Sequence, residues 1–400
     1  MGNKSNKEKK NNSKKENKQS QKELTIYPLI ENSELKFEKK EERCITSFTL
    51  LKNNMIIFTF KGGIIKLYEF EKNKEEIKSK EILSLEENEY CFNYVIQLYD
   101  NNIAICSEDG TLKIFKLLLE TNEKYKIVQK IDEINHDPIY IIKELQNKNL
   151  VLGCWKNILV YQKAEQYELI NKIMIKDYTF SILEIAPNEI IATHCELKTL
   201  TGHNFNTYKF HTIPNIESNE NNNIICNYDN KRDIIFVAFN NGINIVSITK
   251  KLLIKKIILN EIITSICPFE MNINLKHRKN SNKKIFGLLL GAKRKIYGEK
   301  TNYAYSLLQI GFNLNEKNEG KISNDNDDIG EIECIQISRK DRIHYYDITN
   351  LQNSSWNKNI DVFDFIDNKN EQLIFSSGNE DKIFKFWKIK NKKYIYNAFP

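Results

Sequence analysis

The stretch SEDGTLKIFKLLLE (residues 107–120) joins a tight turn to a run of alternating polar and apolar residues. Ser107-Glu108-Asp109-Gly110 forms the turn, and Leu112-Lys113-Ile114-Phe115 forms the run. A polar turn followed by alternating β-branched and aromatic residues is typical of a hairpin strand. Whether this stretch is a single hairpin or one copy of a repeat decides the fold class.

Similar stretches recur along the chain. A turn followed by an alternating run is found in FKGGIIKLYEF (60–70), CWKNILVYQK (154–163), FNNGINIVSI (239–248) and SSGNEDKIFKFWKIK (376–390). An aromatic residue closes four of the runs, at Tyr68, Phe115, Tyr161 and Trp387, and the first two intervals are 47 and 46 residues. The spacing indicates a repeated unit.

Two further β-rich runs precede most of these stretches. In one repeat they are FNYVIQLY (92–99) and IAICS (103–107), separated by the polar turn DNN (100–102). The unit is therefore strand, turn, strand, turn, strand, followed by a weaker fourth strand such as YELINKIMI (167–175). A period of 40 to 50 residues with four strands is typical of a propeller blade, which buries its faces against its neighbours in a ring.

The repeats resemble those of the WD-repeat β-propeller family over residues 24–400. EDGTLKIF and EDKIFKFW are similar to the third-strand signature of that family. The Trp-Asp pair that ends family repeats is missing, and Gly202-His203, the one Gly-His pair, is out of register. The resemblance implies an all-β propeller. Because the family's polar network is mostly missing, we expect the blades to depend on apolar packing, with blade four (176–222) the weakest.

The number of blades follows from the second-to-third-strand turns, expected near residues 62, 109, 156, 198, 241, 292 and 380. These favour seven four-stranded blades, with polar inserts at 272–284 and 313–330. Alternatively, ISRKDRIHYYDI (337–348) forms an eighth hairpin. We expect residues 24–43 to pair with the last blade, which closes the ring and removes open sheet edges.

The first 23 residues form a separate segment. Residues 1–22 contain eight lysines against two glutamates, whereas the whole chain has a net charge of +7, so the remainder is nearly neutral. A tail so rich in Lys, Asn and Ser is expected to be disordered. The near-neutral body gives no support for specific nucleic-acid binding.

Cysteine and histidine residues give little support for a metal site. Several cysteine intervals, such as Cys44 to Cys91 and Cys106 to Cys154, follow the blade period, which we interpret as small apolar residues at equivalent inner-strand positions. No Cys-x-x-Cys pair exists. Four potential zinc ligands are close in sequence, but their spacing fits blade-four strand and loop residues better: His194, Cys195, His203 and His211.

Sequence motifs of enzymes are missing too. The chain has no phosphate loop, Rossmann glycine pattern, nucleophile elbow or His-Glu-x-x-His motif. We therefore expect no catalysis, cofactor or small-molecule substrate. The basic runs KHRKNSNKK (276–284) and KRKIYGEK (293–300) lie on either side of one strand, so we expect them at opposite faces rather than in one patch.

These observations favour a protein-interaction scaffold that binds partner proteins through the loops on one face. The resemblance implies that the second-to-third-strand turns line this face, which gives six candidate binding residues: Lys61, Glu108, Trp155, Asn241, Arg294 and Glu380. Trp155 is the most informative, because an exposed Trp is costly unless it is used. Its alternative role is a partly buried cap on blade three.

The N-terminus supports a rival hypothesis of membrane association. Met1-Gly2 resembles the start of a myristoylation motif, although Asn6 stands where Ser or Thr is usual. One acyl chain binds membranes only marginally, and the adjacent lysines could supply the second signal on an anionic surface. The chain lacks an apolar signal-peptide core and any run of 18 apolar residues. We expect a cytoplasmic protein, with the alternative of a membrane-associated propeller that binds anionic lipid through a myristoylated Gly2 and the basic N-terminus or through the basic loops.

Overall fold

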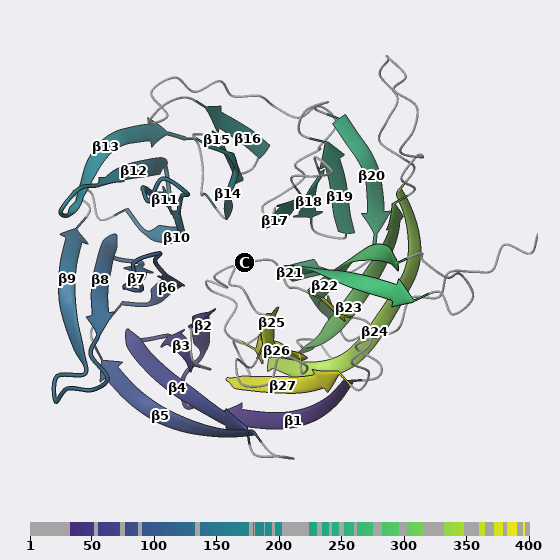
Figure 1. Cartoon of the computed structure of the whole chain (residues 1–400), viewed down its shortest axis with the longest axis horizontal. Helices are drawn as coiled ribbons and strands as arrows, with labels where there is room; N and C mark the ends of the chain where they lie inside the picture. Colours follow the sequence, from purple (N-terminus) through teal and green to yellow (C-terminus); the bar gives the residue numbers. More distant parts are fainter. Residues whose placement is uncertain are drawn as a thin grey trace, which may run out of the picture.

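The computed structural model is a ring of β-sheets around a central axis (Figure 1). It describes residues 33–396 except 52–54, 73–76, 87–89, 133–136, 176–178, 180, 188, 194–196, 202–223, 230–233, 240–241, 248–251, 260–261, 275–281, 296–301, 315–331, 348–359, 365–371, 379–381 and 390–394. The described residues form strands and turns without a helix, so none of their segments is a helix that could span a bilayer. This confirms the predicted all-β class.

The described strands form seven sheets, and each sheet is a blade. Its antiparallel strands are ordered from the inner strand at the axis to the outer strand at the rim. Blade one contains β2 (Ile45–Leu50), β3 (Met55–Phe60), β4 (Ile64–Lys72) and β5 (Ile77–Glu86). Blade two contains β6 (Phe92–Gln97), β7 (Ile103–Ser107), β8 (Thr111–Leu117) and β9 (Tyr125–Asp132). Blade three contains β10 (Ile139–Glu144), β11 (Leu150–Cys154), β12 (Asn157–Lys163) and β13 (Tyr167–Met174).

Blades four to six continue the ring. Blade four has three described strands, β14 (Ser181–Ala186), β15 (Glu189–Thr193) and β16 (Leu197–Thr201). Blade five contains β17 (Ile224–Asp229), β18 (Ile234–Phe239), β19 (Gly242–Ser247) and β20 (Leu252–Ile258). Blade six contains β21 (Ile262–Asn274), β22 (Asn282–Lys295), β23 (Asn302–Leu314) and β24 (Ile332–Asp347), and its inner strand also pairs with β28 (Ile395–Tyr396).

Blade seven closes the ring. It contains β25 (Ile360–Asp364), β26 (Gln372–Gly378) and β27 (Ile383–Ile389), and its outer strand is β1 (Ser33–Lys40) from the other end of the chain. The β1–β27 register runs from the Ser33–Ile389 pair to the Lys40–Ile383 pair. The predicted closure by residues 24–43 is confirmed for residues 33–40.

Seven blades are confirmed, and the alternative of an eighth hairpin at 337–348 is wrong. Residues 332–347 form the single strand β24, which pairs along β23 rather than folding back on itself. The strands next to the inserts predicted at 272–284 and 313–330 extend into those ranges. β21 ends at Asn274, β22 begins at Asn282, and β23 ends at Leu314. The remainder of each insert lies outside the described residues.

Local chemistry explains the turn of the opening stretch. Asp109 follows β7 and accepts hydrogen bonds from the Ser107 hydroxyl and from the Thr111 amide, the latter at 3.0 Å. Gly110 has a φ of 82°, a left-handed conformation that glycine adopts at little cost. The turn therefore ends β7 and directs the chain into β8, the third strand of blade two, as predicted.

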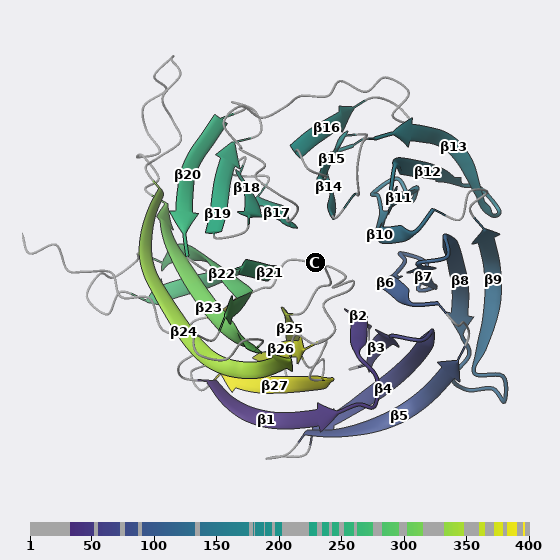
Figure 2. The same ribbon diagram turned by 180° about the vertical axis from the view of Figure 1, so that it is seen from behind.

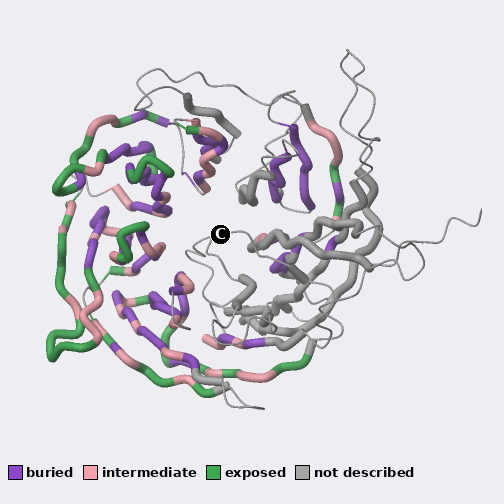
Figure 3. The backbone as a smooth tube through the Cα atoms, in the orientation of Figure 1, coloured by how far each residue is buried: buried purple, intermediate pink, exposed green. Residues whose placement is uncertain are grey.

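The hydrophobic core lies between neighbouring blades, and the exposed residues lie mainly at the rim (Figure 3). Clusters of buried apolar residues join blades one and two, two and three, three and four, four and five, and five and six. A sixth cluster joins blade seven to blade one, where Phe384 stacks on Phe58 with ring centroids 4.7 Å apart. The expected dependence on apolar packing is thus observed.

The two described pairs of periodic cysteines differ in their surroundings. Cys106 and Cys154 are buried in β7 and β11, as expected for inner-strand positions. The same expectation is wrong for Cys44 and Cys91, which precede the first strands of blades one and two and are only half-buried. Their period reflects an equivalent loop position at the end of the blades rather than an apolar core position.

The two faces of the ring carry different connections, because consecutive strands in a blade are antiparallel (Figures 1 and 2). We call the upper face the one that carries the second-to-third-strand turns and the loops between blades. The lower face carries the other turns. Tyr99 and Lys148, in first-to-second-strand turns, therefore lie on the lower face.

Replacement of Phe384 by Ala tests the closing cluster. The Phe384 side chain is fully buried between blades seven and one, so we expect Phe384→Ala to lower the free energy of unfolding by about 3–5 kcal/mol. Ile127→Ala, at an exposed rim position of β9, is the control and should change it by less than about 1 kcal/mol. Urea denaturation measures both. A loss below about 1 kcal/mol for Phe384→Ala would contradict this packing. The side chain of Trp387 lies outside the described residues.

Candidate functional site

Three of the predicted binding residues lie in the expected turns on the upper face. Lys61 lies between β3 and β4, Glu108 between β7 and β8, and Trp155 between β11 and β12. Arg294 does not: it pairs with Ala304 inside β22, because that strand extends to Lys295. Asn241 and Glu380 lie outside the described residues.

The long strand β22 also separates the two basic runs. Lys284 lies near its start and Lys293 near its end, nine residues apart, which corresponds to about 30 Å at the rise of a β-strand. The prediction that these runs do not form one patch is confirmed for the residues within β22. Their remaining residues, 276–281 and 296–300, lie outside the described part of the chain.

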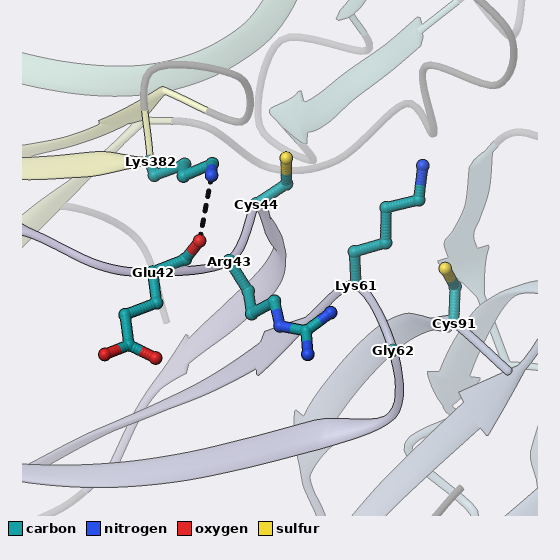
Figure 4. A pocket seen from close by; sticks show the side chains of 7 residues that line it. All are labelled: Glu42, Arg43, Cys44, Lys61, Gly62, Cys91 and Lys382. Carbon is teal, nitrogen blue, oxygen red and sulfur yellow. Dashed lines mark hydrogen bonds between the residues drawn. The ribbon is translucent and has the colours of Figure 1, made fainter. Parts of the chain in front are cut away.

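An open pocket of about 350 Å³ lies on the upper face where blades seven, one and two meet (Figure 4). We call it the cation pocket. It brings together the loop between β1 and β2, the turn between β3 and β4, the loop before β6 and the turn between β26 and β27. Its lining residues are Glu42, Arg43, Cys44, Lys61, Gly62, Cys91 and Lys382.

Backbone hydrogen bonds hold these loops in the same arrangement in successive blades. The Lys61 amide donates to the Cys44 carbonyl at 2.9 Å, and the Glu108 amide donates to the Cys91 carbonyl at 3.0 Å. At the ring closure the Glu41 amide donates to the Lys382 carbonyl at 2.8 Å. The turns and interblade loops are therefore fixed to one another, which positions the pocket side chains.

Lys382 has an unusual backbone for its residue type. Its φ is 60°, in the left-handed region that glycine favours, and Gly110 occupies the corresponding turn position in blade two. A residue with a Cβ costs roughly 1–2 kcal/mol there. Its ammonium group donates to the carbonyl oxygen of Glu42 at 2.8 Å, which holds the charge at the pocket without neutralising it (Figure 4).

The wall between blades one and two combines a thiol, a carboxyl and an ammonium group. Burial raises the pKa of Cys91, and the nearby Glu108 charge acts in the same direction, while the Gly62 amide and the Lys61 charge oppose it. Burial also raises the pKa of Glu108, against the opposing effects of Lys61 and the Cys91 thiol. Cys91 is thus held as a thiol rather than as a reactive thiolate.

A partly buried polar network in blade one contains Glu41, the residue before the pocket residue Glu42. The Tyr68 hydroxyl lies 2.8 Å from a carboxylate oxygen of Glu41 and 2.8 Å from one of Glu81. Lys66 contacts the same two carboxylates at 2.9 and 3.5 Å. Burial alone would lower the pKa of Lys66, but its hydrogen bond to Glu41 and the two negative charges raise it overall. The carboxylate of Glu41 is thereby occupied inside blade one and is separated from the pocket.

Trp155 extends the upper face beyond blade two. Its side chain is 41% exposed, and the ammonium group of Lys156 lies 4.8 Å from the centre of its ring. Such a cation–π contact at an exposed site contributes about 0.5–1 kcal/mol. The alternative of a partly buried cap is therefore only partly met, because a large part of the indole is open to solvent.

Sequence reasoning predicted only Lys61 among the seven pocket residues and missed the other six, which include Arg43, Cys44, Cys91 and Lys382. The signal for the two cysteines was their blade period, which we assigned to the core. Arg43 and Lys382 are 339 positions apart in the sequence, and only ring closure brings them together. Predicted closure combined with the turn at 380 could have identified Lys382.

A cluster of side chains arranged for metal binding is not evident in the described part of the chain. No cluster of three or more His, Cys, Asp or Glu residues with metal-binding geometry occurs among the described residues. His194, Cys195, His203 and His211 lie outside them. The chemistry that the cation pocket offers is charge and hydrogen-bond donation from fixed positions, which suits binding.

Comparison with solved structures identifies the fold as that of a WD-repeat β-propeller. The WD40 propeller domain of Doa1 is 10% identical with a TM-score of 0.53, and the match covers 90% of this chain and 98% of that domain. Saccharomyces cerevisiae Sqt1 is 10% identical with a TM-score of 0.54, covering 90% and 99%. For Chaetomium thermophilum Sqt1 the values are 10%, 0.51, 88% and 84%. No protein-family model and no curated protein sequence matches the chain.

The raised pKa of Glu108 predicts a pH-dependent stability difference. The folded carboxyl group holds its proton more tightly than the unfolded one, so its contribution is greatest in acid and decreases as the pH rises above the ordinary value of 4.5. The free energy of unfolding of Glu108→Gln minus that of wild type should therefore be larger at pH 7 than at pH 4. Urea denaturation at both pH values measures this, with the exposed Glu165→Gln as the control. The same difference between variant and wild type at both pH values would show that folding does not raise the pKa of Glu108.

Proposed function

We propose that this protein is a non-catalytic interaction scaffold whose upper face binds partner proteins. The observation that carries the proposal is the half-exposed Trp155 on the same face as a fixed pocket that presents three cations. Aromatic and arginine residues are the most frequent energetic anchors of protein interfaces. A rigid ring with such anchors in turns of successive blades can bind a partner with little loss of conformational entropy.

The upper face is favoured over the rim for this role. At the rim, exposed apolar side chains are spread along the outer strands of blades two and three, with Ile127 on β9 and Leu169 and Met174 on β13. On the upper face, turns and interblade loops are linked by backbone hydrogen bonds, so charged and aromatic groups from blades seven, one, two and three keep fixed relative positions. Fixed positions favour specific recognition.

Exposed aromatic residues on the two faces provide a matched test. Tyr99, in a lower-face turn, is 61% exposed and serves as the control for Trp155. We expect Trp155→Ala to weaken partner binding about tenfold or more, as for an interface anchor, and Tyr99→Ala to leave it unchanged. Quantitative affinity purification of the tagged wild type and both variants from the native cells measures this. Equal recovery of all partners by wild type and Trp155→Ala would contradict an upper-face interface centred on Trp155.

Membrane association is the second candidate function, favoured by the adjacent Met1-Gly2 start and eight lysines of the tail. The proposal is that Gly2 carries a myristoyl group and that the lysines bind an anionic surface, so that the two signals together anchor the scaffold. The tail lies outside the described residues, so this candidate depends on the sequence.

Intact-mass measurement tests the lipid anchor. Protein expressed in a eukaryotic host should lose Met1 and gain the mass of one myristoyl group, and Gly2→Ala should abolish the gain. The modified protein should co-sediment with vesicles that contain phosphatidylserine, and the variant should do so more weakly. An unmodified N-terminus together with no binding to such vesicles would remove the membrane candidate.

A further inference from the structure

We infer that the cation pocket binds an acidic segment of a partner protein, in which several carboxylates lie along an extended chain. This inference deepens the proposed docking function of the upper face and rests on it. It assigns the pocket a ligand class, which the protein-binding role alone does not.

The charge of the pocket is the first argument. Arg43, Lys61 and Lys382 provide three cations, and among the described residues none of them forms an ion pair with a carboxylate. The Glu42 carboxylate points away from the Lys61 and Lys382 ammonium groups in Figure 4, and the carbonyl of the same residue accepts a hydrogen bond from Lys382. Among the described residues the pocket therefore presents three cations without a bonded carboxylate, and an anionic ligand can bind to them.

The nearby carboxyl groups do not remove this charge. Glu41 is buried in the network with Tyr68 and Lys66, so its negative charge is already paired inside blade one. Glu108 and Lys61 attract each other, but the two side chains form no ion pair, and burial raises the pKa of Glu108.

The cost of keeping Lys382 is the second argument. A glycine at this position would relieve the left-handed strain, as Gly110 does in blade two. Strained residues persist when the surroundings enforce them, and they concentrate at binding sites. Here the strained residue places an ammonium group at the pocket (Figure 4).

The arrangement of the charges favours carboxylates on an extended chain over a single phosphate. In Figure 4 the ammonium groups of Lys61 and Lys382 lie on either side of Cys44, and the Arg43 guanidinium group lies on a third side, toward Gly62. The cations surround an open pocket rather than converging on one point.

Half-buried thiols in the pocket provide a local test of occupancy. The probe is an oligoglutamate peptide, and the readout is the rate at which iodoacetamide alkylates Cys44 and Cys91 in the full-length chain, measured by peptide mass spectrometry. Because the readout is local, peptide bound to the lysine-rich tail does not contribute. We expect oligoglutamate to slow alkylation of both thiols, oligolysine to have no effect, and salt to reverse the protection.

Charge variants identify the residues responsible. Arg43→Gln combined with Lys61→Gln should weaken protection by oligoglutamate about tenfold or more, as expected for loss of charged hydrogen-bond donors. Lys382→Gly should weaken it too, whereas Lys148→Gly should not. Lys148 is a well-matched control because it also has a left-handed backbone, with φ 68°, and lies on the lower face. Loss of one cation and relief of one strained residue are thus common to both glycine variants.

The inference is overturned if oligoglutamate gives wild type no protection, or if the double variant is protected as well as wild type. It is also overturned if inorganic phosphate or phosphatidylserine vesicles protect the thiols while oligoglutamate does not. A partner that depends on Trp155 but not on Arg43 and Lys61 would overturn the acidic-segment inference and leave the docking function intact. A partner that is lost from Trp155→Ala and from the Arg43 and Lys61 double variant, but not from Tyr99→Ala or Lys148→Gly, would support both the docking function and the acidic-segment inference.

Discussion

The fold depends on the contact between the two ends of the chain in blade seven. A four-stranded blade is too thin to bury its own apolar faces, so every blade needs a neighbour on each side. The strand β1, from near the N-terminus, supplies the outer strand of the blade that contains β27, and Phe384 stacks on Phe58 of blade one. Without this contact, blades one and seven would each expose an apolar face to water.

The same contact creates the candidate binding site. The Lys382 turn belongs to the C-terminal part of the chain, whereas Arg43 lies in the loop between β1 and β2 and Lys61 in the turn between β3 and β4. The hydrogen bonds from the Glu41 amide to the Lys382 carbonyl and from the Lys382 ammonium group to the Glu42 carbonyl join the two parts. Closure therefore fixes the position of Lys382 relative to the other two cations, which links stability to the site's charge arrangement.

The sequence was sufficient to predict features that depend on local patterns. Alternation in runs such as 112–115, with Asp109 and Gly110 in the turn before them, identified the strands, and the period of the repeated turns identified seven blades. It was not sufficient to locate strand ends in blade six, where β22 continues through Arg294 although the basic residues resemble a turn. Polarity alone does not end a strand when its neighbours extend equally far, as β21 and β23 do.

Residues that depend on distant contacts were harder to predict. Cys44 and Cys91 share the blade period with buried cysteines, and only the three-dimensional arrangement shows that they lie at a pocket. Trp155, in contrast, could be identified because its turn is defined by the repeat and an exposed Trp is unusual. The candidate site is therefore partly predictable where it follows the repeat and unpredictable where it depends on ring closure.

Amide hydrogen exchange of β1 is the most direct test of the closed ring. If residues 33–40 form a complete strand of blade seven, their amides that bond to β27 should exchange about as slowly as those within blade one. Peptide-resolved mass spectrometry of the full-length protein compares this segment with residues 55–60. Slow exchange in both segments is the predicted result. Exchange of residues 33–40 at the rate of an unstructured peptide, with 55–60 protected, would show that the ring is not closed by β1.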